Sequence, residues 1–365
     1  MSLGEAEQGF LLRAVLQLPA EPVGALDWTA LADRARTLGV SGLAWRAAAP
    51  LGLSPAPPGY AALRRHAEDD AAQTALTVNA FARASRALAA AGVPCLALKG
   101  VALCVHDPGY GPLRHVSDLD LLVRGADAGK ADAVLRADGA RPLPRRPTLE
   151  GAHGLAAAAA EPVATGVGGY VDTTGVKLDL HVAPPAEVEG GTEGLLARAI
   201  HAEVQGVAVR VPALEDLAVI ACEHALVHHV GDPAFLPRLA ADLVRLGARG
   251  ALAQPGRSPA VAEGLALVEE ARSAAASRAP APTRLGQAFE PAGWAPGFRK
   301  RAVGRLRLLS RKGWISLFPS RAYLAASYGV PDETWWLPLL HVRRLLVDQP
   351  LAVLGWRGRR GGHRG

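Results

Sequence analysis

SDLDLLV, at residues 117–123, has the alternation of a β-strand with its acidic residues on one side. Asp118 and Asp120 are two positions apart, so their side chains project from the same face of such a strand. Leu119 and Leu121 then point to the opposite face. Two carboxylates in one small volume repel each other unless a cation, a proton or an arginine compensates them. Because magnesium is the natural partner of hard oxygen ligands, the stretch predicts a metal-binding strand.

A third carboxylate lies in a second predicted strand, where residues 176–182 read VKLDLHV with Asp179 between two leucines. Three carboxylates that hold one or two Mg²⁺ (or Mn²⁺) ions against a triphosphate would neutralise the leaving pyrophosphate and activate an attacking oxygen. The alternative is an edge strand whose aspartates only face water, and for Asp118 and Asp120 alone this alternative is preferred. Asp179, together with a strand-turn-helix element upstream, favours a site for metal-dependent phosphoryl transfer.

The upstream element begins with a short apolar strand at 93–98, VPCLAL, which ends at Lys99 and Gly100. A helix is predicted directly afterwards, at 101–105. Gly100 lets the backbone approach a phosphate at the start of that helix. Lys99 either contacts the same phosphate or balances the charge of the neighbouring acidic site, and the sequence leaves both interpretations open.

Polar residues next to the two acidic strands are further candidates. Arg114 and Ser117 precede the first strand and are candidates for contact with donor phosphates or with a substrate anion. Loop solubility and strand capping explain them equally well. His181 shares the predicted strand face of Asp179 and would orient that carboxylate or approach the metal, although a packed structural histidine is the preferred interpretation.

The hydrophobic periodicity and the turn residues divide the chain into five regions and indicate an α/β (α+β) fold. More helix than strand is expected, because alanine is abundant. Helices at 195–202, 214–230, 235–246, 261–276, 298–310 and 335–346 are expected in the second half. The predicted regions are N-terminal helices at 1–91, an α/β core at 92–185, a helical substrate-side region at 186–277, a Pro-Gly-Ala-rich loop or linker at 278–297, and C-terminal helices with a basic tail at 298–365.

Several motifs in this chain occur together in one order. They are Leu98-Lys99-Gly100, Arg114 with residues 117–123, LDLH at 178–181, and LED at 214–216 with His224 and His229. In this combination the chain resembles an uncharacterised bacterial nucleotidyltransferase family of the DNA polymerase β-like superfamily. The resemblance covers about residues 92–246 and implies a polymerase β-like core with a small mixed sheet flanked by helices.

The resemblance also implies the donor and the site. A nucleoside triphosphate would be the donor, and Asp118, Asp120 and Asp179 would hold the metal. The helix that follows residue 214 would line the pocket, which adds His224 and Asp242 to the candidates. One departure is evident, since the phosphate-binding turn of the superfamily usually ends in Gly-Gly or Gly-Ser whereas this chain has a lysine and a glycine there.

Composition limits the classes of partner and compartment. The formal net charge is +6 and the isoelectric point is near 9.5, which suits an anionic substrate but falls short of a dedicated DNA-binding protein. Cys95, Cys104 and Cys222 are sparse and lack paired metal spacing, so we expect neither disulfides nor a zinc site. These features favour the cytoplasm, and no membrane-spanning or secretory segment is expected.

The leading hypothesis is a Mg²⁺-dependent enzyme that transfers a nucleoside monophosphate, most simply AMP, to an unidentified acceptor such as a small molecule, peptide or RNA. One alternative is a protein of the same fold that has lost catalysis and binds a nucleotide or peptide in a biosynthetic assembly, which the altered turn favours. A second alternative is a toxin-like enzyme that modifies tRNA or protein, which the mildly basic charge permits.

Overall fold

The structure is a computed structural model of the chain, and seven segments of it are described. They comprise residues 3–19, 26–143, 168–184, 188–229, 234–250, 258–276 and 283–289. The helices expected at 298–310 and 335–346, and the basic tail, lie outside these residues.

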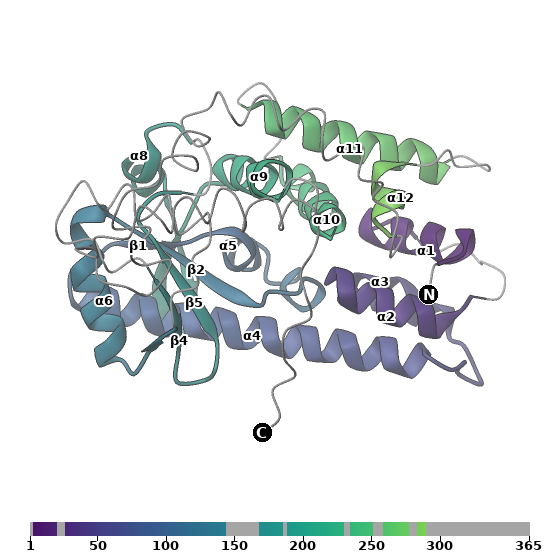
Figure 1. The fold of residues 1–365 in the computed structure, drawn as a ribbon, viewed down its shortest axis with the longest axis horizontal. Coiled ribbons are helices and arrows are strands. Elements are labelled where there is room, and N and C mark those ends of the chain that lie inside the picture. The colour runs from purple at the N-terminus through teal and green to yellow at the C-terminus, as the bar shows by residue number, and fades with distance from the viewer. Residues whose placement is uncertain are drawn as a thin grey trace, which may run out of the picture.

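Four helices form the N-terminal part, as the sequence predicts. They are α1 (Glu5–Val15), α2 (Trp28–Leu38), α3 (Ser41–Ala48) and α4 (Tyr60–Ala90). The 31-residue helix α4 extends from these helices to the sheet along one side of the molecule (Figure 1). It packs on α2 and α3 and also on the strands, so one rod of alanine-rich helix supports both parts.

A five-stranded mixed sheet forms the centre of the α/β part, with strand order β1-β2-β5-β4-β3. Its strands are β1 (Cys95–Ala97), β2 (Asp118–Val123), β3 (Arg141–Pro142), β4 (Gly169–Val171) and β5 (Lys177–His181). Strands β2 and β5 are parallel and the other neighbours are antiparallel. Helix α5 (Lys99–His106) follows β1, and α6 (Ala128–Ala137) follows β2. The small mixed sheet with flanking helices confirms the predicted α/β (α+β) class.

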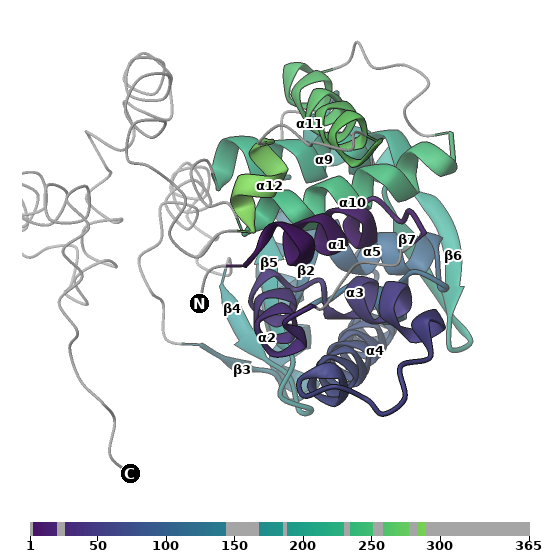
Figure 2. The same cartoon turned by 90° about the vertical axis from the view of Figure 1, so that its right-hand side faces the viewer.

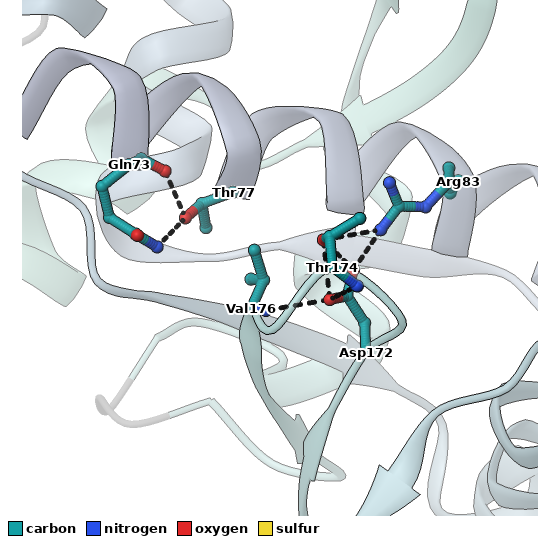
Figure 3. Close-up of polar contacts among 6 residues, drawn as sticks. All are labelled: Gln73, Thr77, Arg83, Asp172, Thr174 and Val176. Atoms are coloured by element: carbon teal, nitrogen blue, oxygen red, sulfur yellow. Dashed lines mark hydrogen bonds and ion pairs between the residues drawn. The ribbon is translucent and has the colours of Figure 1, made fainter. Parts of the chain in front are cut away.

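The turn between β4 and β5 is closed by the side chain of Asp172. Its carboxylate accepts hydrogen bonds from the backbone amides of Thr174 at 2.8 Å and Val176 at 2.9 Å, as in an Asx turn. The same carboxylate forms an ion pair with Arg83 of α4 (Figure 3). Helix α4 therefore anchors the start of β5, which begins one residue after this turn.

A β-hairpin replaces part of a predicted helix. The helix expected at 195–202 is wrong beyond Ala197, because α8 (Gly191–Ala197) is followed by β6 (Ile200–Val204) and β7 (Val207–Val211). Gln205 and Gly206 both have positive φ angles, as a two-residue hairpin turn requires. The Gln-Gly pair is the local signal that the helical interpretation overlooked.

The C-terminal described part is helical and packs on the N-terminal helices. Helix α9 (Leu214–Glu223) continues into a π-helical turn (His224–His228), and α10 (Phe235–Ala248), α11 (Pro259–Ala276) and α12 (Arg284–Ala288) follow. The short helix α12 lies inside the stretch that was predicted to be a loop or linker. Figure 2 shows α1 between α10 and α3, and α1 contacts α3, α10, α11 and α12.

One continuous set of buried apolar side chains extends from Leu3 to Phe289 and includes members from the N-terminal helices, the sheet and the C-terminal helices. The sequence-based division into regions stays a prediction, and these regions share a core. Within the described ranges, no helix combines the length and apolar character that crossing a bilayer requires.

Candidate active site

The register of two parallel strands brings the predicted carboxylates together. Asp118 of β2 pairs with Lys177 of β5, and Asp120 pairs with Asp179. Paired residues in a parallel ladder point to the same face, so the three aspartates and Lys177 share one face of the sheet. His181, two residues after Asp179, shares it too. The leucines that alternate with these residues are buried on the opposite face.

Asp120 is the buried member of the acidic group, with 4% of its surface exposed. Its Oδ1 atom lies 2.8 Å from Nζ of Lys99 and 2.8 Å from Nε2 of His181. Burial raises the pKa of Asp120, but the charge of Lys99 and the hydrogen bond from His181 outweigh burial and hold that pKa well below its usual range. Asp120 is therefore an anion held by two partners inside the protein.

Asp118 and Asp179 are more exposed and share one ammonium group. Nζ of Lys177 lies 2.7 Å from Oδ2 of Asp179 and 3.7 Å from Oδ2 of Asp118. Ser117 lies beside them and donates a hydrogen bond from Oγ to Oδ1 of Asp118 at 3.3 Å. Burial lowers the pKa of Lys177, but the hydrogen bond to Asp179 and the negative charges of Asp179, Asp118 and Asp120 together raise it by more, so the amine stays protonated.

The donor set suits a hard divalent cation. The three aspartates supply oxygen ligands from rigid strands, which is the chemistry that Mg²⁺ and Mn²⁺ prefer. The ammonium of Lys177 already marks a cationic position between Asp118 and Asp179. Among the described residues, no group of three or more His, Cys, Asp or Glu has the spacing of an assembled metal centre. Lys99 and Lys177 compensate the carboxylates instead.

Lys99 begins α5 with a positive φ of 52°, a conformation that non-glycine residues seldom adopt. Its ammonium contacts Asp120. Of the two roles that the sequence left open for Lys99, this contact corresponds to balancing the charge of the acidic site. A contact between Lys99 and a phosphate stays a prediction.

Arg114 is directed into the protein. It forms a two-pronged ion pair with Asp242 of α10, with Nε 3.0 Å from Oδ1 and Nη2 2.9 Å from Oδ2. Tyr110 donates to the same Oδ1 at 3.0 Å. Burial lowers the pKa of Arg114 and Asp242 raises it by more, so the guanidinium stays charged. The contact between Arg114 and a donor phosphate stays a prediction, and the structure gives the guanidinium a buried partner.

Gly100 leaves room for Arg114. A Cβ atom at position 100 would lie 2.9 Å from Nη1 of Arg114 and 3.0 Å from Cγ2 of Val116. The glycine therefore permits close packing between the start of α5 and the segment before β2, in addition to any approach of the backbone to a phosphate.

Replacement of Gly100 by alanine is expected to lower the free energy of unfolding by about 1–3 kcal/mol, because the crowded methyl group outweighs the gain in helix propensity. Urea unfolding at constant m-value would measure the change. Gly125→Ala is the matched control, since nothing lies within 4 Å of a Cβ there. Equal stability of the two variants would contradict the close packing of Gly100.

Threonines of α4 hold the segment that leads into β2. Oγ1 of Thr74 donates to the carbonyl of Arg114 at 2.7 Å and accepts from the amide of Val116 at 3.0 Å. Thr77, whose contact with Gln73 is seen in Figure 3, also reaches the carbonyl of Val116 at 3.3 Å. Helix α4 thus sets where Asp118 begins the strand.

A pocket of about 350 Å³ lies over this strand face. All ten residues that the sequence and the resemblance proposed for the site line it, and helices α9 and α10 form its other wall. The lining residues are Lys99, Gly100, Leu103, Arg114, His115, Val116, Ser117, Asp118, Asp120, Lys177, Asp179, His181, Leu217, Ala221, His224, Ala225, His229, Phe235, Arg238, Leu239 and Asp242.

The family of the chain follows from a comparison with known proteins. Residues 24–270 match the family model described as uncharacterised nucleotidyltransferase. The chain belongs to this nucleotidyltransferase family. Among curated proteins, none matches the chain. Membership supports transfer of a nucleoside monophosphate as the general activity. The match extends from the N-terminal helices into α11, so the nucleotidyltransferase region includes the helices on both sides of the sheet.

The helical wall of the pocket carries a cluster of rings. His224 and His229 lie on the π-helical turn, and their Nε2 atoms are 3.2 Å apart. The ring of Phe235 stacks on His229 with a centroid distance of 3.8 Å, and the guanidinium of Arg238 lies 4.8 Å from the Phe235 centroid. A π-helical turn adds one residue to the ordinary spacing, which brings positions five apart onto one side.

Sequence reasoning missed Lys177, Phe235 and Arg238 among the pocket residues, and only Lys177 has a clear signal. Lys177 stands two positions before Asp179, and strand alternation alone puts it on the acidic face. Phe235 and Arg238 have no such signal, because their place in the pocket depends on how α10 packs against distant parts of the chain. The resemblance named His224 and Asp242, and both line the pocket.

Proposed function

We propose that this nucleotidyltransferase transfers a nucleoside monophosphate, most simply AMP, from a nucleoside triphosphate to an acceptor, with Mg²⁺ or Mn²⁺ as the metal. The observation that supports the proposal best is the register of β2 and β5, which puts three carboxylates on one face at the edge of a pocket. A pocket of this volume suits a ligand of nucleotide size.

Each residue of the strand face has a role in this proposal. Asp118, Asp120 and Asp179 hold the metal, which neutralises charge on the donor phosphates when it is bound. Asp179 is exposed enough to accept the proton of the attacking group, since 31% of its side chain is accessible. Asp120 is the anchor, because Lys99 and His181 fix its orientation. Lys99 keeps the buried charge balanced.

The wall formed by α9 and α10 is the acceptor side of the pocket in this proposal. Imidazole and guanidinium groups from His224, His229 and Arg238 line it. Arg114 and Asp242 stabilise this wall, because their ion pair joins α10 to the segment that enters β2. Acceptor selection is therefore assigned to the helical region rather than to the sheet.

Asp118→Asn is expected to lower the Mg²⁺-dependent affinity for a nucleoside triphosphate by at least about tenfold, because one metal ligand loses its charge. Calorimetric titration of the four ribonucleoside triphosphates, with and without Mg²⁺, measures the change. The side chain of Asp118 is 38% exposed, so the variant keeps the fold. Asp69→Asn, at an exposed position of α4, is the matched control. Triphosphate affinity that ignores both Mg²⁺ and this substitution would contradict the proposal.

A catalytically inactive nucleotide-binding protein is the second candidate, because internal ammonium groups already compensate the acidic face. The two candidates differ in turnover. Release of pyrophosphate that requires Mg²⁺ and Asp118 would support the transferase, whereas tight nucleotide binding with no pyrophosphate release would support the binding protein.

A further inference from the structure

Three cations of the pocket hold carboxylates, and they differ in exposure. Lys99 pairs with Asp120, and Arg114 pairs with Asp242; the side chains of the two cations are 19% and 14% exposed. Lys177 bridges Asp118 and Asp179, and its side chain is 47% exposed. Separation of a buried ion pair leaves an uncompensated charge inside the protein, whereas separation of an exposed pair costs little. Lys177 is therefore the member of this set that can leave its carboxylates.

We infer that Lys177 alternates between two anions: it bridges Asp118 and Asp179 in the metal-free protein, and it binds the phosphate chain of the donor when a divalent cation is held there. This inference rests on the proposed function. It adds a residue that binds the triphosphate, and it states which carboxylates hold the ammonium of that residue when no nucleotide is bound.

Charge balance supports the exchange. The two carboxylates of Asp118 and Asp179 carry two negative charges, and one ammonium compensates only half of them. A divalent cation compensates both, so the ammonium becomes surplus at its original place. A triphosphate brings new negative charge into the same pocket, and a charge-assisted hydrogen bond to phosphate then stabilises the displaced ammonium.

The fold allows the movement without any change in the backbone. Lys177 is the first residue of β5, and the ladder with Asp118 fixes its Cα atom on the acidic face. Its flexible four-carbon stem lets the ammonium move by several ångströms within the pocket, which it already lines. The Asp172 turn, anchored on Arg83, holds the start of this strand in place.

Substitution of Lys177 by glutamine is expected to change two affinities in opposite directions. Mn²⁺ alone would bind about two- to fivefold more tightly, because the competing ammonium is gone. The α,β-methylene analogue of ATP, in saturating Mg²⁺, would bind about tenfold more weakly, because a charge-assisted contact is lost. Calorimetry measures both affinities without any turnover. Lys177→Arg would keep the phosphate affinity within a few-fold of wild type, and Lys130→Gln, at an exposed position of α6, would change neither.

Each outcome decides the inference. Opposite shifts in the glutamine variant support it. Unchanged affinity for the analogue, or shifts in the same direction, overturns it while the proposed function survives, provided that the wild type binds the analogue with Mg²⁺. Failure of the wild type to bind the analogue overturns the proposed transfer of AMP and the inference together. Far-ultraviolet circular dichroism and the urea midpoint verify that every variant is folded.

Discussion

Replacement of Asp242 by asparagine is expected to lower the free energy of unfolding by about 3–5 kcal/mol, because the guanidinium of Arg114 would remain buried without a countercharge. The pair is almost enclosed, since the side chain of Asp242 is only 5% exposed. It also joins α10 to the segment before β2, which are 128 positions apart in the chain. Loss of the pair would therefore loosen one wall of the pocket as well as destabilise the fold.

Urea unfolding of the single variants Asp242→Asn and Arg114→Met, and of the double variant Arg114→Met/Asp242→Leu, would test this expectation. The apolar double variant should recover much of the loss, because it leaves no buried charge. Recovery would be partial, since Tyr110 loses the oxygen to which it donates. A cost below about 1 kcal/mol for Asp242→Asn, similar to that of an exposed pair, would contradict the buried geometry.

Replacement of Lys99 by methionine is expected to lower the free energy of unfolding by about 3–5 kcal/mol at neutral pH, because the buried Asp120 would lose the ammonium that pairs with it. In the wild type, the folded-state pKa of Asp120 lies below the unfolded value of about 3.9. The ionised carboxylate therefore stabilises the fold at pH values above that unfolded pKa, and this contribution is lost as the pH falls through the lowered folded pKa.

Removal of the ammonium weakens this effect. Burial is then opposed only by His181, so the pKa of Asp120 rises above its wild-type value and the variant gains stability relative to the wild type as the pH falls and the carboxyl becomes protonated. Urea unfolding of both proteins at several pH values between 7 and about 4 would show the difference shrinking toward acid, in line with linkage. Lys130→Met, at an exposed position of α6, is the control. A difference that stays constant with pH would show that Lys99 acts through packing and not through Asp120.

The two buried pairs and the exposed Lys177 have complementary functions in the proposed mechanism. Lys99 and Arg114 keep the strand and the helical wall in fixed positions, because their release would cost several kcal/mol. Lys177 exchanges easily because water reaches it. The site therefore combines a rigid acidic frame with one movable cation.

Short stretches of sequence were enough to predict several elements of the α/β part of this protein. Alternation of aspartate and leucine in 117–123 determined the strand β2 and the shared face of Asp118 and Asp120, since side chains in any β-strand alternate. The same rule applied to Asp179. The apolar run at 93–98 indicated the strand before Lys99, and the residues after it indicated the helix that follows. The ordered motifs indicated the nucleotidyltransferase family.

Other features were decided only by the tertiary structure, because they depend on contacts between residues far apart in the chain. Pairing of β2 with β5 in parallel register put Lys177 opposite Asp118, and neither strand specifies that register by itself. The ion pair between Arg114 and Asp242 of α10 joins residues 128 positions apart, and no local pattern indicates it. Strand β6 begins at Ile200, inside the predicted helix at 195–202, because its pairing with β7 overrides the weak helical propensity of that stretch.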